Sequence, residues 1–411
     1  MVKKKDILIV YGSLNSVPST EGAAPAKVIY ETVLTSKENY FKVLSNSNIN
    51  LNDSDYDKNV FLHVKPTFLD QFILLILKIR YPYIKRREKF ITGNNRQLLY
   101  YISVCRFLFF NPYDKIIIHV GIGLVKMIKM FYPKKEIIFY HHGTSLHSKL
   151  SERQWNSLIN NVKSIIGVNK IALIKANMHF ANKLNPSRYF KINNAIIPNV
   201  FKNTASINTK YTIDCNKFNF AFSGRICIEK GVLNLLKAFS IVYKKNTNVS
   251  LYILGGAGTK EKDNIITPYL KECMEYTSLS NLPVVFTGFL NKSDLMNCLS
   301  HIDVSICPTD KKLSEEGMPL TIIESFSNSI PVIATDSGGI REMLINEVNG
   351  YLIEDYPYID DLANKMIQIS TDTKMCKTMS VNAYKSYVTN YQYDIYNKKL
   401  TSVLETCDFI N

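Results

Sequence analysis

Short runs of consecutive apolar residues recur along the chain and alternate with segments of helical periodicity. A strand buried on both faces is apolar at every position, so these runs predict parallel sheets covered by helices on both sides. In the first half the predicted strands are DILIVYG (6–12), YFKVLS (40–45), NVFLHV (59–64), KIIIHVG (115–121), EIIFYHHG (136–143) and SIIGVN (164–169). In the second half they are the start of KFNFAFSGRICIEKG (217–231), VSLYILGGAG (249–258), VVFTGFL (284–290), DVSICPT (303–309) and PVIAT (331–335).

Helices are predicted between these strands, among them one from about Ala24 and three final ones over about 358–370, 373–391 and 393–406. A chain of 411 residues is long for one hydrophobic core, which favours two or three domains. The polar segment 202–217 reads as a linker, so the fold class is α/β with a domain boundary near residue 199. The expected domains are 1–198 and 199–390, with a terminal segment 391–411.

The apolar segments and the cysteines favour a cytoplasmic protein over a secreted or membrane-spanning one. The start MVKKKDILIVYGS has too short an apolar run for a signal peptide, and the most apolar segment, FILLILKI (72–79), is too short to span a membrane. The eight cysteines include no C-x-x-C pair, which favours reduced thiols in a cytoplasmic protein.

Positive charge is concentrated in the first half. Residues 1–200 carry 29 Lys and Arg against 12 Asp and Glu, whereas residues 201–411 carry 21 against 23. A basic half predicts contact with an acidic surface or substrate, such as an anionic membrane or a lipid-linked phosphate acceptor. The cluster of Lys78, Arg80, Lys85, Arg86, Arg87 and Lys89 is the candidate contact, with a solvated helix end as the alternative. No nucleic-acid recognition motif accompanies the charge, so nucleic acid is not an expected partner.

The candidate chemistry centres on residues 313–345. Glu316 and Glu324 lie eight residues apart across a predicted helix start, where Pro319 suits the first helical position. A helix N-terminus favours an anion such as a diphosphate, and with proline at 319 the backbone amides must come from Met318 and Leu320. The plain alternative is a pair of solvated glutamates beside an ordinary helix.

This segment, followed by PVIAT, a Gly-Gly turn and NGYLI (349–353), resembles the donor-site signature of the retaining glycosyltransferases of family 4, which have the GT-B fold. Three other stretches resemble that family: the first loop with Gly22, IIPNVF (196–201), and the element with Gly224, Arg225, Lys230 and Gly231. The resemblance implies two Rossmann-like domains facing across a cleft, the first binding the acceptor and the second the nucleotide-sugar donor. It also implies a final helix that crosses back to the first domain.

The resemblance also implies roles for individual residues. Glu316 would bind the sugar hydroxyls, Glu324 the ribose, and Arg225 with Lys230 the diphosphate, without a metal or other cofactor. His142, in FYHHGTSLH (139–147), would lie against the transferred sugar; a core histidine is the alternative. The remaining expected substrate-binding residues are Gly22, Gly224, Gly255, Gly256, Met318, Pro319 and Leu320.

The expected function is therefore a retaining, metal-independent transfer of a sugar from a nucleotide diphosphate sugar, with uridine as the expected base. The acceptor would belong to a bacterial cell-surface glycan pathway, and the enzyme would be cytoplasmic, with peripheral contact at the inner face of the membrane. Two alternatives stay open: a nucleotide-sugar epimerase on the same fold, and a noncatalytic protein that keeps it. The Asp-x-Asp motifs at 53–57 could hold a metal, but they lie in an Asn-rich loop, which favours a solvated turn.

Overall fold

A computed structural model describes residues 6–19, 23–37, 40–47, 56–80, 95–144, 150–179, 185–197, 213–257 and 266–410. The chain forms two compact units, one of Met1–Asn193 with Tyr396–Asn411 and the other of Asn194–Ile395. The domain boundaries expected from the sequence fall after residues 198 and 390. Gly22, His147, most of the predicted linker and the Lys85–Lys89 part of the basic cluster lie outside the described residues.

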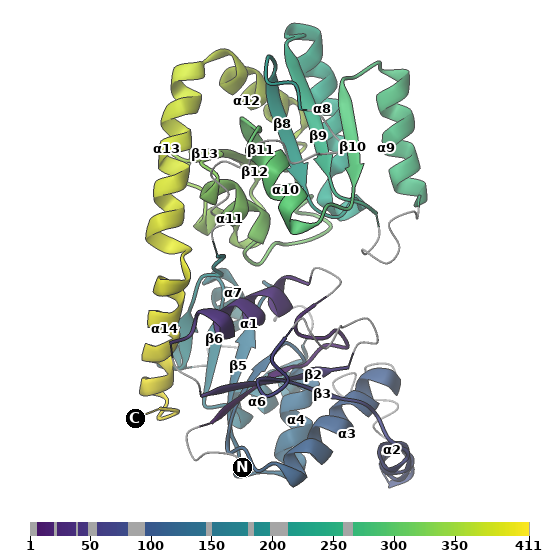
Figure 1. Ribbon diagram of the computed structural model, residues 1–411, viewed down its shortest axis with the longest axis vertical. Coiled ribbons are helices and arrows are strands. Elements are labelled where there is room, and N and C mark those ends of the chain that lie inside the picture. Colours follow the sequence, from purple (N-terminus) through teal and green to yellow (C-terminus); the bar gives the residue numbers. More distant parts are fainter. Residues whose placement is uncertain are drawn as a thin grey trace. The chain divides into compact units, whose positions relative to one another are not determined.

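The first unit, unit 1, contains a seven-stranded parallel sheet in the order β3-β2-β1-β4-β5-β6-β7 (Figure 1). Its strands are β1 (Ile7–Tyr11), β2 (Phe41–Asn46), β3 (Phe61–Val64), β4 (Lys115–His119), β5 (Glu136–His141), β6 (Ser164–Gly167) and β7 (Tyr189–Lys191). Its main helices are α1 (Ala24–Thr35), α2 (Phe68–Arg80), α3 (Asn95–Phe110), α4 (Ile122–Phe131), α6 (Glu152–Asn161) and α7 (Ile171–His179). Six of the seven strands match the predicted runs; β7 was not predicted.

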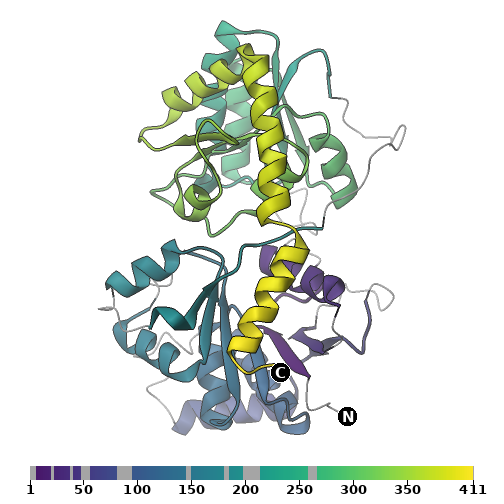
Figure 2. The ribbon, with the colours of Figure 1, turned by 90° about the vertical axis from the view of Figure 1, so that its left-hand side faces the viewer.

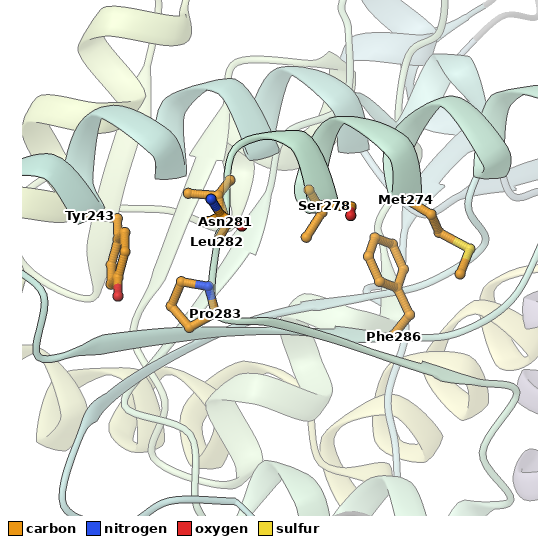
Figure 3. Close-up of a pocket in the computed structure, with 8 residues that line it drawn as sticks. Tyr243, Met274, Ser278, Asn281, Leu282, Pro283 and Phe286 are labelled. Carbon is orange, nitrogen blue, oxygen red and sulfur yellow. The ribbon is translucent and has the colours of Figure 1, made fainter.

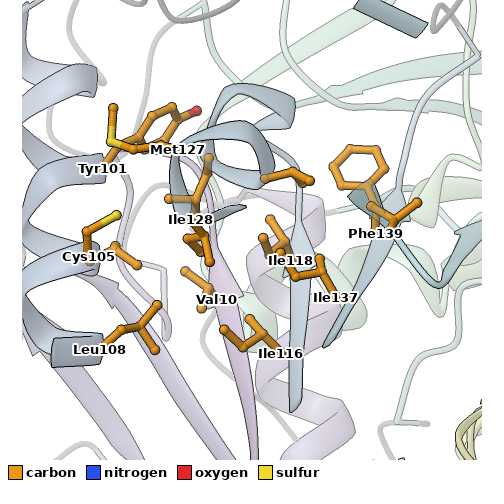
Figure 4. Packing of buried hydrophobic residues seen from close by; sticks show 14 of the residues in the cluster. Val10, Tyr101, Cys105, Leu108, Ile116, Ile118, Met127, Ile128, Ile137 and Phe139 are labelled. Carbon is orange, nitrogen blue, oxygen red and sulfur yellow. The ribbon is translucent and has the colours of Figure 1, made fainter. Parts of the chain in front are cut away.

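The core of unit 1 forms where α3 and α4 cover the sheet (Figure 4). Ile116 and Ile118 of β4 are fully buried, and Met127 and Ile128 of α4 pack in the same cluster. Every residue of β1 is buried, which is why its sequence is apolar throughout rather than alternating. The continuous apolar pattern thus reflects a sheet with both faces covered.

The chain ends in unit 1 with α14 (Tyr393–Thr406), seen in yellow in Figure 2. Asn397 donates to Thr35 at the end of α1 over 3.0 Å, and Cys407 lies 3.0 Å from Ser164 of β6. Lys115 donates to the carbonyl of Phe409 over 3.2 Å. These contacts attach the final residues to both the sheet and a helix of unit 1.

The second unit, unit 2, contains a six-stranded parallel sheet in the order β10-β9-β8-β11-β12-β13. Its strands are β8 (Phe218–Ser223), β9 (Val249–Leu254), β10 (Val284–Gly288), β11 (Val304–Cys307), β12 (Val332–Thr335) and β13 (Gly350–Ile353). Its helices are α8 (Val232–Lys245), α9 (Pro268–Leu279), α10 (Lys292–Leu299), α11 (Leu320–Ser327), α12 (Ile359–Thr371) and α13 (Thr373–Asn390). The predicted doubly wound α/β class is therefore confirmed for both units.

Both sheets reverse their strand order once. In unit 1 the reversal lies between β1 and β4, and in unit 2 between β8 and β11. Loops that leave the carboxyl ends of such a strand pair diverge, so ligands of doubly wound sheets bind there. These two places are where candidate functional residues should be sought.

Candidate functional site

The predicted donor residues of unit 2 converge on its strand reversal. Gly224 follows β8, and Thr309 follows β11, the neighbouring strand across the reversal. Lys230 is the last residue of a short 3-10 helix, Ile228–Lys230, that leads into α8. Because β8 and β11 are neighbours in the sheet, their carboxyl ends bring the residues that follow them to the same edge.

Lys230, Glu316 and Thr309 form a half-buried polar cluster. The ammonium of Lys230 lies 2.5 Å from Oε1 of Glu316, and the hydroxyl of Thr309 donates to the same oxygen over 2.7 Å. The side chains of Lys230 and Glu316 are 28% and 13% exposed. Burial lowers the pKa of Lys230, but the charge and hydrogen bond of Glu316, together with Cys307 and Cys227, outweigh it, so the pKa is raised overall. The lysine is thus a fixed cation at the edge where an anionic ligand would bind.

The loop that carries Glu316 is fastened from the neighbouring segment. The backbone amide of Gly339 donates to the carbonyl of Glu316 over 2.7 Å, and the hydroxyl of Ser337 donates to the carbonyl of Ser314 over 2.9 Å. Thr335, at the end of β12, donates to the carbonyl of Thr309 over 2.6 Å. The Ser337-Gly338-Gly339 turn therefore positions the glutamate. It leads into a 3-10 helix, Gly338–Glu342.

The predicted glycines pack backbone against backbone. Gly224 donates from its amide to the carbonyl of Leu254 over 3.0 Å, and Ile226 donates to the carbonyl of Gly256 over 2.9 Å. Gly224 and Gly255 have φ of 148° and 150°, a conformation that L side chains rarely adopt. A Cβ on Gly255 would lie 2.0 Å from the carbonyl oxygen of Gly224. These glycines are required by the joining of β8 and β9, whatever ligand binds there.

Helix α11 begins one residue later than predicted. Pro319 is its N-cap, with φ −65° and ψ 126°, and Leu320 is the first helical residue. The extended ψ of Pro319 excludes it from the helix, so its expected place at the first helical position is wrong. Met318 is buried, and its carbonyl accepts from the side chain of Asn194 over 2.9 Å. Glu324 lies one turn further along α11 and is half-buried.

Arg225 is exposed and pairs with an acid that is not part of the cluster. Its side chain is 61% exposed and pairs with Glu229 over 3.4 Å, one helical turn away in sequence. An exposed pair of this kind contributes little to stability, so the guanidinium can exchange its partner at small cost.

In unit 1, His142 follows the carboxyl end of β5 and pairs with a second histidine. Its Nε2 lies 2.9 Å from Nδ1 of His119, the last residue of β4, and its ring stacks on Tyr140 with centroids 4.7 Å apart. Burial lowers the pKa of His142 to about 3, with the charge of His141 adding to the shift, and burial lowers the pKa of His119 as well. Both imidazoles are therefore neutral near pH 7, and one donates to the other.

The strand reversal of unit 1 also contains a strained residue. Val120, directly after β4, has φ 64°, which is unfavourable for a β-branched side chain. Gly121 follows with φ 74° and starts α4. Strained backbone of this kind is concentrated at binding sites, so the Val120–Gly121 turn marks the same edge of the sheet as the histidine pair.

We expect the histidine pair to make stability depend on pH. The unfolded chain protonates its histidines below about pH 6.5, whereas the folded protein keeps these two neutral down to their lowered pKa values. The free energy of unfolding should therefore fall on acidification by about 1.4 kcal/mol per pH unit for a fully buried imidazole. The loss should be smaller for His142, which is partly exposed. Urea unfolding at pH 7.5 and 5.0 measures this loss of unfolding free energy. The loss should be smaller in the His119→Asn/His142→Asn double variant than in the unmodified protein; equal losses would contradict this account.

Sequence reasoning missed Thr309 and His119. Both stand at the carboxyl ends of strands that were predicted correctly, β11 and β4. Each contacts a residue that was predicted, Glu316 and His142 respectively. The rule that ligands gather at carboxyl ends of parallel strands could have identified them.

Unit 2 also has a pocket that is separate from the candidate site (Figure 3). It is lined by Tyr243 of α8, Met274 and Ser278 of α9, and Pro283 and Phe286 at β10. Pro283 precedes β10, so the pocket is at the amino end of that strand and not at the edge that carries the candidate site.

Among the described residues, the structure brings together no group of three or more His, Cys, Asp or Glu side chains that could hold a metal ion. Asp57 is the one member of the Asp-x-Asp motifs within the described ranges, and its carboxylate accepts from the amide of Asn59 over 2.8 Å, as in a turn. Asp53 and Asp55 lie outside these ranges.

Comparison with known proteins links this architecture to sugar transfer. Residues 204–386 match the family described as glycosyl transferases group 1. The relative YtcC of Bacillus subtilis is 23% identical over 364 residues, covering 84% of this chain and 86% of its own length. A UDP-Gal:alpha-D-GlcNAc-diphosphoundecaprenol alpha-1,3-galactosyltransferase of Escherichia coli is 30% identical over 179 residues. That match covers 43% of this chain and 42% of the galactosyltransferase.

The fold comparison extends over both units. The crystal structure of Anabaena HepE in complex with UDP-glucose is similar with a TM-score of 0.70, over 98% of this chain and 99% of that chain. Its sequence identity is 17%, so this likeness concerns the fold alone. The matched family segment, 204–386, falls within unit 2, which contains Lys230 and Glu316. The chain therefore has the GT-B fold, and residues 204–386 of its second unit match the group 1 glycosyl transferase family.

Proposed function

We propose that this protein transfers a sugar from a uridine diphosphate sugar to a glycan or lipid-linked acceptor, with retention of the anomeric configuration. The observation that carries the proposal is the Lys230–Glu316–Thr309 cluster at the strand reversal of unit 2, in a segment that matches group 1 glycosyltransferases. The choice of uridine is supported by HepE and by the galactosyltransferase, whose names state UDP-sugars. A lipid-linked acceptor is supported by the diphosphoundecaprenol acceptor named for the galactosyltransferase.

In the proposed reaction, the bond between the anomeric carbon and the diphosphate oxygen breaks, and the acceptor oxygen bonds to the same face of that carbon. Negative charge grows on the leaving diphosphate, and the cation of Lys230, supplemented by Arg225, stabilises it without a metal. The leaving oxygen takes the acceptor proton. Glu316 and Glu324 hold hydroxyls of the sugar and the ribose, and His142 lies at the sugar as a neutral hydrogen-bonding group.

The cellular setting is part of the same proposal. Unit 1 supplies the acceptor site, and the acceptor belongs to cell-surface glycan synthesis. The enzyme acts at the cytoplasmic face of the membrane. In the described part of the chain no helix is both long and apolar enough to cross a bilayer.

The test is product analysis by NMR after incubation with a panel of UDP-sugars and both free and lipid-linked sugar acceptors. We expect a glycoside whose anomeric configuration equals that of the donor, formed with or without a chelator. An inverted product would overturn the retaining mechanism, and epimerised donor formed without acceptor would identify an epimerase instead.

A further inference from the structure

Helix α2 of unit 1 has two apolar faces, of which only one is packed. The inner face is fixed on α3 by Asp70, a fully buried carboxylate that accepts from Nε of Arg106 over 3.0 Å and from the hydroxyl of Ser103 over 3.0 Å. Leu74 packs on the same side in the core cluster of unit 1. Although burial opposes ionisation, the hydrogen bonds from Arg106, Thr67 and Ser103 together lower the pKa of Asp70, so the helix is held by a charged pair. In Figure 1, α2 lies on the outside of α3.

The outer face of α2 is apolar and exposed. Its large side chains recur at spacings of three and four residues, which places them on one side of a helix. They are Phe68 (90% exposed), Leu69 (54%), Phe72 (59%), Leu75 (54%), Ile76 (44%) and Ile79 (71%). A helix with apolar residues all round is normally buried, and an exposed face of this kind marks an interaction surface.

More aromatic side chains extend this surface at the neighbouring helix ends. Phe109 and Phe110 are 71% and 70% exposed at the end of α3, one turn beyond Arg106, whose guanidinium reaches the first turn of α2. Phe131 is exposed at the end of α4, and the next residue, Tyr132, donates to the carbonyl of Cys105 in α3 over 2.8 Å. We call these three residues and the outer face of α2 the apolar face of unit 1.

The chain around the apolar face is strongly basic. Residues 65–80 and 95–135 contain ten Lys and Arg and two Asp, a net charge of +8. Both acids are paired within the unit, Asp70 with Arg106 and Asp114 with Lys135 over 3.8 Å. Lys65, Arg96 and Lys134 are exposed on the same three-helix region.

We propose that the apolar face of unit 1 docks on an anionic lipid bilayer, with α2 lying in the plane of the interface. Helix α2 has 13 residues, which corresponds to about 20 Å and cannot span a hydrocarbon core of about 30 Å. The apolar side chains enter the boundary between headgroups and acyl chains, and the flanking Lys and Arg bind lipid phosphates. This inference deepens the proposed function, because a lipid-linked acceptor is reached at such a surface.

Charge favours the bilayer over a second copy of the chain. In a symmetric dimer the same face meets itself, which would bring together two copies of a region whose residues 65–80 and 95–135 carry a net charge of +8. An anionic membrane instead neutralises the charge, because its lipid phosphates attract each Lys or Arg near the surface. Projecting side chains such as Phe68 also suit a fluid interface, since no preformed pocket is needed to receive them.

The test is flotation of the full chain with two kinds of vesicle, without nucleotide or acceptor. One kind is phosphatidylcholine alone, and the other also contains about 30 mol% of the anionic lipid phosphatidylglycerol. We expect binding to the anionic vesicles that weakens with salt, and at least a tenfold loss in the triple variant Phe68→Ser/Phe72→Ser/Ile79→Ser. The matched control is Leu279→Ser/Val381→Ser, which removes two apolar side chains that are 86% and 68% exposed on unit 2. It should bind as the unmodified protein does.

Three results would overturn the proposal: no vesicle binding by the unmodified protein, equal binding by the triple variant, or conversion of a dimer into a monomer by the triple variant in sedimentation. UDP binding by the triple variant separates the two questions. Normal UDP binding with lost vesicle binding supports membrane docking whatever acceptor is used. Vesicle binding without any UDP binding would leave the docking surface intact and contradict the proposed function.

Discussion

Replacing Lys230 or Glu316 with alanine should lower turnover at least a hundredfold, which corresponds to about 2.7 kcal/mol of transition-state stabilisation. Lys230 supplies the half-buried positive charge at the strand reversal of unit 2, and Glu316 orients it. In the proposed reaction Glu316 also binds hydroxyls of the sugar. Loss of either partner removes an interaction that strengthens as the diphosphate leaves. The measurement is steady-state turnover with a saturating donor.

The folded state must be shown to survive these changes. Removing one partner of a partly buried pair leaves the other uncompensated, so Lys230→Met and Glu316→Gln, which keep the side-chain volume, should accompany the alanine variants. Lys271→Ala is the matched control, because its ammonium pairs with Glu275 on the exposed face of α9 and should be dispensable. Near-normal turnover in both alanine variants would refute the assigned site.

Replacing Gly255 with alanine should destabilise unit 2 by about 3 kcal/mol, the sum of overpacking and backbone strain. The new Cβ would lie 2.0 Å from the carbonyl oxygen of Gly224 and 2.9 Å from its carbonyl carbon, both in the backbone. Because a backbone cannot rotate away as a flexible side chain can, β8 and β9 must separate at their carboxyl ends. The measurement is the free energy of unfolding from urea titration.

Gly288 provides the matched control for this variant. Its φ is 69°, so alanine is also strained there, but an added Cβ would meet open space. Gly288→Ala should therefore cost about 1 kcal/mol from the left-handed conformation alone. Equal losses in the two variants would mean that close packing against Gly224 is not what requires glycine at 255.

The sequence predicted strands better than it predicted contacts. The run ILIVY is apolar throughout and VIAT is apolar up to its final threonine, and both form fully buried parallel strands. The strand Tyr189–Lys191 was missed because it has three residues, and each is only half-buried, so its sequence lacks an apolar run.

The candidate site was predicted as separate motifs, and its assembly was not. Lys230 and Glu316 are 86 residues apart, and no local pattern reports their contact. Thr309 went unnoticed because a threonine at a strand end is unremarkable in sequence until the sheet order places it at the reversal. The outer face of α2 shows the same limit, since an apolar helix in sequence does not tell which of its faces will be covered.

The central claim is tested most directly by calorimetric titration of UDP into the unmodified protein and into Lys230→Ala, each with a chelator and then with magnesium. We predict saturable UDP binding with the chelator present, no gain from magnesium, and at least tenfold weaker binding to Lys230→Ala. Guanosine, adenosine and thymidine diphosphates serve as controls for the base. Absence of binding by all four nucleotides, or equal UDP affinity in the two proteins, would contradict a donor site built on Lys230.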